Sequence, residues 1–254
     1  MLDTISATRY VTPLKEGGSL PGVVEADDEG TYVVKFRGAG QGLKVLVAEV
    51  IVAGLADRLG LRVPRLAVIG MPSAIARYEA DEEVQDLLNA SPGTNLAVDF
   101  LPGAFGYDGS RTPEPEEAAR VRWLDAFTAN VDRTWANPNL LMWHRRLWLI
   151  DHGAALYFHH GWPRRAPDAE RFAAQHFDAS EHVLAEVGPP AASVHDAAVA
   201  ALDAPTLRAV IDAVPDEWLE PTDWLPDAES ARAAYVDHLT ARLATPAAWL
   251  GGMP

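Results

Sequence analysis

The amino-acid sequence predicts an α+β fold with two lobes, a small β-rich N-terminal lobe with one long helix and a larger, mostly helical C-terminal lobe. Two observations predict it. Before residue 100, short runs of β-branched and aromatic residues alternate with turn residues, whereas after residue 116 apolar residues recur at helical spacing. Residues 101–115, rich in glycine, proline and charge, separate the two patterns. We therefore expect the N-terminal lobe at residues 1–103 and the C-terminal lobe at residues 104–254.

The N-terminal lobe should begin with a three-stranded meander at residues 8–14, 23–25 and 31–36. Apolar residues recur at helical spacing over residues 43–59, and Gly60 stands where a C-cap glycine is expected, which predicts one helix of four or five turns. Short apolar runs at residues 64–69 and 95–100 predict two further strands. A polar helix or loop is expected between them, at residues 79–89.

The C-terminal lobe should begin with an amphipathic helix at residues 116–131, which has one apolar stripe of Val121, Leu124, Phe127 and Val131. The apolar runs at residues 139–143 and 147–150 predict a hairpin that ends at Asp151. From residue 168 onward, alanine-rich stretches interrupted by proline predict several helices.

Composition excludes several classes of function. With 254 residues, 48% of them hydrophobic, the chain can bury a large core, and its lack of cysteine excludes thiol catalysis and zinc–thiolate sites. The net charge of −15 disfavours nucleic acid and anionic membrane surfaces as partners. The first residues show no signal-peptide pattern, and no apolar run approaches the roughly 20 residues of a membrane span. We therefore expect a cytoplasmic protein.

The densest group of polar side chains lies in residues 130–141 (NVDRTWANPNLL), and residues 147–153 (LWLIDHG) follow closely. Phosphoryl transfer requires an aspartate that positions the attacking hydroxyl, together with an asparagine and a second aspartate that hold magnesium. Asp132 is the candidate for the first role. Asp151, with Asn137 or Asn139, is the candidate for the second, because Mg²⁺ prefers hard oxygen ligands.

The N-terminal half contains the residues expected to bind a nucleotide. Lys35 ends an apolar strand, and Glu49 lies 14 residues further on in the long helix (49 − 35 = 14). In kinase-like lobes, a strand lysine in this position holds nucleotide phosphates, and an acid on the next helix orients it. A glycine-rich turn, in which backbone N–H groups can approach phosphates, contains Gly17, Gly18 and Ser19.

Three motifs together resemble those of the HipA-like serine/threonine kinases, a branch of the protein-kinase-like superfamily. They are residues 32–38 (YVVKFRG), the loop that contains Asp132, and residues 150–153 (IDHG), and the resemblance covers about residues 14–156. It implies the two-lobed protein-kinase-like fold, a hinge that takes the adenine near Phe100 and Leu101, and four further roles. These are Lys35 on the ATP phosphates, Glu49 as its partner, Asp132 as catalytic base and Asp151 as the metal-binding acid.

The chain departs from the family pattern at two points. The family spacing between the catalytic aspartate and the metal-binding asparagine favours Asn137, whereas the apolar run that follows favours Asn139. Both stay candidates, and Asn137 is the preferred one. The usual Asp-Phe-Gly is replaced by Asp151-His152-Gly153, whose middle residue is not a metal ligand.

We thus expect a kinase that uses ATP and magnesium to phosphorylate a Ser or Thr hydroxyl of a protein. Two alternatives stay open, a kinase of a small molecule or lipid headgroup, and a pseudokinase that binds nucleotide or a protein partner without turnover. The sequence does not identify the phosphoryl acceptor or the oligomeric state.

Overall fold

The chain divides into two units, and the computed structural model describes residues 2–14, 20–40 and 42–251. The first unit comprises Met1–Leu46 and Pro64–Pro102, and the second comprises Val47–Val63 and Gly103–Pro254. One boundary falls at Pro102 and Gly103, where the sequence pattern changes. Residues 47–63 differ from the expected division, because they group with the second unit.

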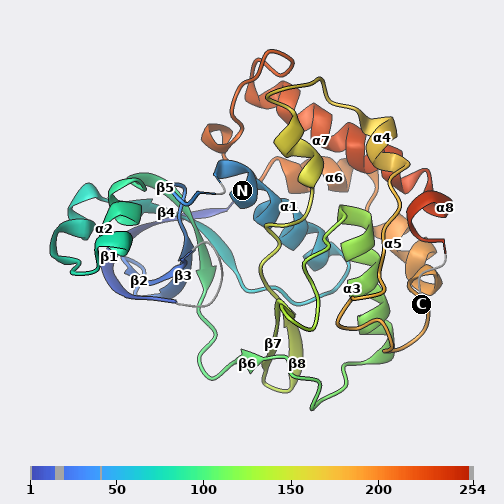
Figure 1. The fold of residues 1–254 in the computed structure, drawn as a ribbon, viewed down its shortest axis with the longest axis horizontal. Coiled ribbons are helices and arrows are strands. Elements are labelled where there is room, and N and C mark those ends of the chain that lie inside the picture. Colours follow the sequence, from blue (N-terminus) through green and yellow to red (C-terminus); the bar gives the residue numbers. More distant parts are fainter. Residues whose placement is uncertain (1, 15–19, 41, 252–254) are drawn as a thin grey trace. The chain divides into compact units, whose positions relative to one another are not determined.

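Five strands close into a barrel in the first unit, in the order β1-β2-β3-β5-β4 (Figure 1). Their bounds are β1 Asp3–Pro13, β2 Gly22–Ala26, β3 Thr31–Lys35, β4 Leu66–Met71 and β5 Gly93–Asp99. β1 pairs antiparallel with β2 and parallel with β4, and this parallel pairing completes the ring. Along β3, Tyr32 and Val34 are buried while Thr31, Val33 and Lys35 are partly exposed, as the two-residue period of a strand requires.

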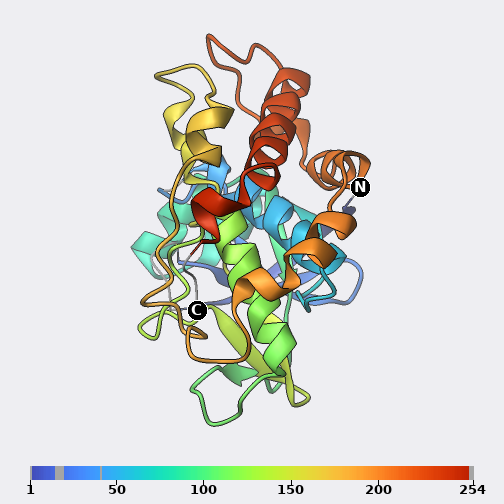
Figure 2. The same cartoon turned by 90° about the vertical axis from the view of Figure 1, so that its right-hand side faces the viewer.

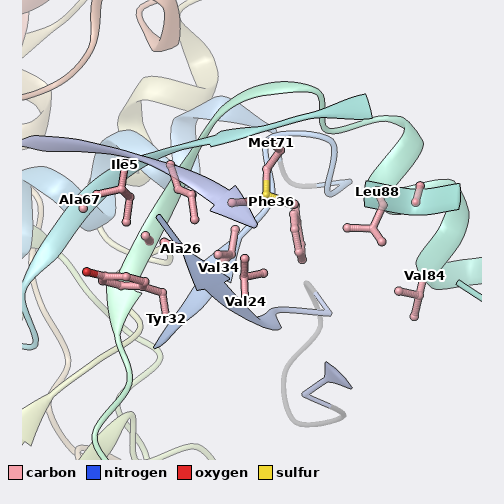
Figure 3. Close-up of a cluster of buried hydrophobic side chains, with 14 residues drawn as sticks. Ile5, Val24, Ala26, Tyr32, Val34, Phe36, Ala67, Met71, Val84 and Leu88 are labelled. Atoms are coloured by element: carbon pink, nitrogen blue, oxygen red, sulfur yellow. The ribbon is translucent and has the colours of Figure 1, made fainter. Parts of the chain in front are cut away.

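The interior of the barrel is apolar, with side chains from all five strands pointing into it (Figure 3). A 3-10 helix, Ser73–Tyr78, and α2, Glu82–Asn89, connect β4 to β5. Asp81 caps α2 by accepting a hydrogen bond from the backbone N–H of Glu83 at 3.0 Å. Val84 and Leu88 of α2 join the cluster that contains Phe36, which extends β3. The burial of these side chains fixes the strand that carries Lys35.

The long helix α1, Leu43–Arg58, agrees with the expected helix. Its Gly54 faces α6, Ala204–Ile211, so closely that a Cβ atom there would lie 2.8 Å from Cγ1 of Val210. Beyond the helix, the carbonyl of Arg62 accepts a hydrogen bond from the N–H of Leu149 at 2.8 Å. These contacts explain why residues 47–63 belong to the second unit.

The second unit is mostly helical (Figure 2). Its helices after α1 are α3 Pro115–Thr128, α4 Ala169–Ala173, α5 His195–Ala201, α6, α7 Ala228–Leu243 and α8 Pro246–Trp249. Short 3-10 helices lie at Tyr157–Gly161, Ala191–Val194 and Asp216–Trp218. α4 packs against α7 (Figures 1 and 2). Over the described ranges, no helix combines the length and the apolar character needed to cross a membrane.

A small sheet in the second unit has the order β6-β7-β8. The expected hairpin is present as β7 Leu140–Trp143 and β8 Arg146–Leu149, and the two-residue β6, Phe105–Gly106, was not expected. His144 and Arg145 form the hairpin turn with φ angles of 46° and 63°, a left-handed pair that matches the twist of the strands. The overall composition of strands and helices confirms the α+β class.

Helix α3 corrects one expectation, because it is not amphipathic. Every residue of Glu117–Thr128 except Arg120 is buried, including Arg122 and Asp125. The helix also ends earlier than expected, since Ala129 adopts a left-handed conformation with φ 54°. Val131, expected on the apolar stripe, lies beyond the helix and is 66% exposed.

Candidate active site

Asp132 lies in a hydrogen-bonded loop between α3 and β7. Nδ2 of Asn137 donates to its Oδ2 at 2.8 Å, and Nδ2 of Asn139 donates to the same oxygen at 3.3 Å. The backbone N–H of Asp132 donates to Oδ1 of Asn130 at 3.3 Å. The structure therefore brings Asp132 and both candidate asparagines together on one carboxylate.

Short backbone hydrogen bonds shape this loop. The N–H of Thr134 donates to the carbonyl of Asn137 at 3.1 Å, and the N–H of Asn137 donates to the carbonyl of Thr134 at 3.2 Å. Asn139 has a left-handed backbone with φ 49°, which asparagine tolerates better than most residues. The loop thus needs an asparagine at position 139 for its conformation as well as for its contact with Asp132.

Asp151 lies two residues after the end of β8 and also has a left-handed backbone, with φ 53°. The N–H of the preceding Ile150 donates to the carbonyl of Asn139 at 3.1 Å. This bond joins the end of β8 to the loop that carries Asp132, so the two predicted motifs of the second unit are neighbours.

Arg133 is 1% exposed, and its guanidinium group links these two motifs. Its Nη1 donates to the carbonyl of Asn139 and, at 3.5 Å, to the carbonyl of Ile150, the residue before Asp151. Its Nε donates to Oδ2 of Asp125 at 2.6 Å, within a fully buried ion pair. A guanidinium with several fixed donors is suited to hold separate chain segments in one arrangement.

Asp125 is fully buried on α3 and accepts hydrogen bonds from three side chains. Besides Arg133, Nδ2 of Asn130 donates to Oδ1 at 3.0 Å and Nε2 of His182 donates to Oδ2 at 2.9 Å. Nδ1 of His182 accepts a hydrogen bond from the N–H of Leu184 at 3.0 Å, so Nε2 carries the proton. Burial alone would raise the pKa of Asp125, but the charge of Arg133 and these hydrogen bonds outweigh it and lower the pKa to about 2.

Sequence reasoning missed Asp125, Arg133 and His182. Asp125 is next to Leu124 in an apolar helix, where a buried charge requires a partner, and this was the available signal. Its partners lie in two other segments, and nothing in the sequence links them to α3.

The end of β3, which carries Lys35, is held by buried side chains of the first unit. Lys35 is partly exposed and pairs with β5. Just after it, the N–H of Arg37 donates to Oδ1 of the buried Asn95 at 2.7 Å, and the N–H of Gly38 donates to Oγ of Ser91 at 3.2 Å. The strand end is thus fixed where the sequence predicts a phosphate-binding lysine.

The other predicted nucleotide-binding residues are less constrained by the structure. Glu49 is buried on α1 in the second unit, so its expected pairing with Lys35 stays a prediction. Phe100 is 37% exposed and Leu101 is buried, and both stand just before the unit boundary at Pro102. Three predicted residues lie outside the described residues: Gly17, Gly18 and Ser19.

The donors around Asp132 suit a hard divalent cation. Because the amide nitrogens of Asn137 and Asn139 donate to Asp132, their amide oxygens are the atoms that could bind a cation, and Asp151 is the carboxylate that the sequence predicts beside them. Among the residues that the structure describes, no three His, Cys, Asp or Glu side chains gather so as to hold a metal ion.

Comparison with solved structures finds a similar fold in one kinase and a weaker likeness in another. The proinflammatory kinase CtkA of Helicobacter pylori is 12% identical over 91% of this chain and 90% of its own, with a TM-score of 0.54. A Golgi casein kinase with Mn and ADP bound is 11% identical over 95% of this chain and 72% of its own, with a TM-score of 0.45. No curated protein matches the chain in sequence.

Comparison with family models gives a match that spans nearly the whole chain. The model described as HipA-like kinase covers residues 8–250, which include both units and every candidate residue named above. The match extends well beyond the motifs in residues 14–156 and takes in all the helices of the second unit. The chain belongs to the HipA-like kinase family.

Proposed function

We propose that the protein transfers the γ-phosphoryl group of ATP to a Ser or Thr hydroxyl in a magnesium-dependent reaction. The observation that carries this proposal is the convergence of Asn137 and Asn139 on the carboxylate of Asp132, joined through Ile150 to Asp151. Family membership supports kinase activity, and the arrangement of this loop supports the division of roles.

Asp132 acts on the acceptor side. Both asparagine amides donate to its Oδ2, so Oδ1 is the oxygen assigned to the acceptor hydroxyl. The two amides hold the carboxylate in one orientation, which lowers the entropy lost when the hydroxyl is positioned. As the hydroxyl attacks phosphorus, Asp132 accepts its proton.

Asp151 and the amide oxygens of Asn137 and Asn139 hold the cation, which neutralises charge on the phosphates when bound. Asn137 is exposed, whereas Asn139 is only 8% exposed. The backbone carbonyl of Asn139 also accepts a hydrogen bond from Arg133, which holds this residue within the loop. We therefore assign the main metal contact to Asn137. Asn139 then mainly maintains the loop.

The first unit and the chain just before its boundary bind the nucleotide. Lys35, with Glu49 as its partner, contacts the α- and β-phosphates. Gly17, Gly18 and Ser19, which lie outside the described residues, are assigned to the same phosphates on the family resemblance alone. Phe100 and Leu101 contact the adenine. The fixed end of β3 supports the position of Lys35, and the other assignments follow from the family resemblance.

The test has two steps. Thermal unfolding is measured with ATP alone, with magnesium alone and with both, because a ligand that binds only the folded state stabilises it by about 2.7 kcal/mol at 100 times its Kd. Transfer of labelled γ-phosphate to peptides that contain one Ser, Thr or Tyr is then measured for the wild type, Asp151→Ala and the control Asp223→Ala.

We expect ATP with magnesium to raise the unfolding temperature, and transfer to Ser and Thr to require Asp151 but not the exposed Asp223. Stabilisation by ATP without any transfer would indicate a pseudokinase and overturn the proposal. Transfer only to small molecules would overturn the proposed acceptor.

A further inference from the structure

The second unit contains a pocket of about 1160 Å³ that the proposed catalytic residues do not line. Residues of the 3-10 helix Tyr157–Gly161, the following turn, α4 and α7 form its walls. Ligand pockets in proteins typically measure about 300–1,000 Å³, so this one has room for several side chains of a bound segment.

The charge of this pocket is opposite to that of the whole chain. Three arginines line it, Arg164, Arg165 and Arg171, in a protein with a net charge of −15. All three are exposed, and none of their guanidinium groups forms an ion pair or hydrogen bond with a described side chain. The one acidic residue of the lining, Asp168, uses its Oδ1 to accept the backbone N–H of Arg171 at 2.9 Å. Three cations and one anion leave the pocket with an excess positive charge (3 − 1 = 2).

The inner wall of the pocket is aromatic and well packed. The rings of Phe158 and His238 are stacked with centroids 4.4 Å apart, and Trp162 packs on Tyr235 at 4.6 Å. Nδ1 of His238 donates to the carbonyl of Ala234 at 2.7 Å, and burial lowers the pKa of this histidine. Burial thus favours the neutral form of the His238 imidazole, and the three arginines supply the positive charge counted above.

The chain connects this pocket directly to the loop that carries Asp132. Ala129, which lines the pocket, is the left-handed residue that ends α3, and the catalytic loop begins at the next residue, Asn130. A second link lies just before the 3-10 helix Tyr157–Gly161, where the N–H of Leu156 donates to the carbonyl of Thr128 at 2.8 Å. The start of the catalytic loop and one wall of the pocket thus share the same backbone.

We propose that this pocket binds anionic side chains of a polypeptide acceptor, so that the preferred substrate has carboxylate or phosphate groups near the phosphorylated Ser or Thr. Guanidinium groups bind both anions through paired N–H donors, and arginines without partners are ready to do so. The proposal rests on the proposed function, because it assigns the acceptor of that reaction.

The test separates binding from transfer. Three synthetic peptides carry one Ser flanked by Glu, by Gln or by Lys, and their binding is measured by titration calorimetry without nucleotide. The same peptides are then used as acceptors with labelled ATP. Inorganic phosphate is added as a competitor, to distinguish a site for a free anion from a site for an acidic peptide.

The test variant is Arg164→Gln/Arg171→Gln, and the control is Arg58→Gln/Arg77→Gln, which removes the same charge from exposed sites outside the pocket. Arg165 is left in place because its guanidinium lies against the backbone at Gly161, where an added Cβ atom would be 2.7 Å from its Nε. Thermal unfolding checks that both variants fold.

We expect the Glu peptide to bind at least about 10-fold more tightly than the Gln peptide, and the test variant but not the control to lose that preference. Equal binding of the Glu and Gln peptides, or an unchanged preference in the test variant, would overturn the proposal. So would phosphate competition with no preference among the peptides. Transfer to all three peptides at equal rates would leave the kinase function intact but reject the pocket as a binding site for an acidic acceptor. Tight binding of the Glu peptide without any transfer would reject the kinase function alone.

Discussion

Replacing Arg133 by leucine should both destabilise the second unit and abolish phosphoryl transfer. Arg133 forms a fully buried ion pair with Asp125 and also donates to the carbonyls of Asn139 and Ile150. In Arg133→Leu, the carboxylate of Asp125 keeps only its bonds from Asn130 and His182. Loss of one partner of a buried pair typically costs about 3–5 kcal/mol, a large part of the roughly 5–15 kcal/mol that stabilises a protein.

Urea unfolding followed by tryptophan fluorescence measures this effect in the second unit, because all eight tryptophans lie at or after Trp123. The control is Arg58→Gln, an exposed arginine of the same unit. We expect a loss of about 4 kcal/mol for Arg133→Leu and less than about 0.5 kcal/mol for the control.

The double variant Arg133→Leu/Asp125→Leu distinguishes the buried charge from lost packing. Removing the unpaired carboxylate should return at least about 1 kcal/mol of stability, since apolar replacements of buried pairs are often tolerated. Transfer should stay abolished in the double variant, because no guanidinium then holds the carbonyls of Asn139 and Ile150. A loss below about 1 kcal/mol in Arg133→Leu, with transfer at the wild-type rate, would refute the role of Arg133 as the link between the two motifs.

Three further predictions follow from the same contacts. Because the pKa of Asp125 is lowered to about 2 from an ordinary 3.8, its ionised form contributes about 2–3 kcal/mol that is fully present above pH 4 and is lost as pH falls toward 2. Urea unfolding from pH 5 to pH 2 should therefore show a shallower loss of stability in Asp125→Asn than in the wild type, and equal slopes would contradict this. Asn137→Ala should raise the magnesium concentration needed for half-maximal transfer by roughly 10-fold, whereas Asn139→Ala should mainly lower the free energy of unfolding, by about 1–2 kcal/mol. Magnesium titration of both variants shows which asparagine binds the cation, and the reverse pattern would assign the cation to Asn139. Lys35→Met should weaken ATP binding by roughly 10-fold or more, as measured by calorimetry, with Lys44→Met as the control; unchanged affinity would remove Lys35 from the phosphate site.

The sequence predicted the local elements because their signals are local. The turn at Gly60, the period-two pattern of β3 and the apolar runs of β7 and β8 each lie within a few residues, and the structure contains α1, β3 and the hairpin where they were expected. The parallel pairing of β1 with β4 joins residues about 64 positions apart (67 − 3 = 64), and no local pattern reveals such a contact. The closed barrel was therefore not predicted.

The candidate site shows the same division. Asp132, Asn137 and Asn139 stand in one short segment, so the sequence could propose them together, and the structure shows that they contact one another. Both amides donate to the same carboxylate oxygen, so the structure, like the sequence, keeps both asparagines beside Asp132. The network of Arg133, Asp125 and His182 was not predicted, because buried charges resemble surface charges in a sequence until their partners are located.

The proposed kinase mechanism is tested most directly by single-turnover phosphoryl transfer in Asp132→Asn, with ATP affinity measured in parallel. The amide keeps the shape of the carboxylate but cannot accept the hydroxyl proton, while Lys35, Asp151 and the asparagines that bind nucleotide and metal are unchanged. We predict nearly unchanged affinity for ATP with magnesium and a fall in transfer rate of roughly 10²-fold or more. Transfer at the wild-type rate in Asp132→Asn would contradict the assignment of Asp132 as the catalytic base.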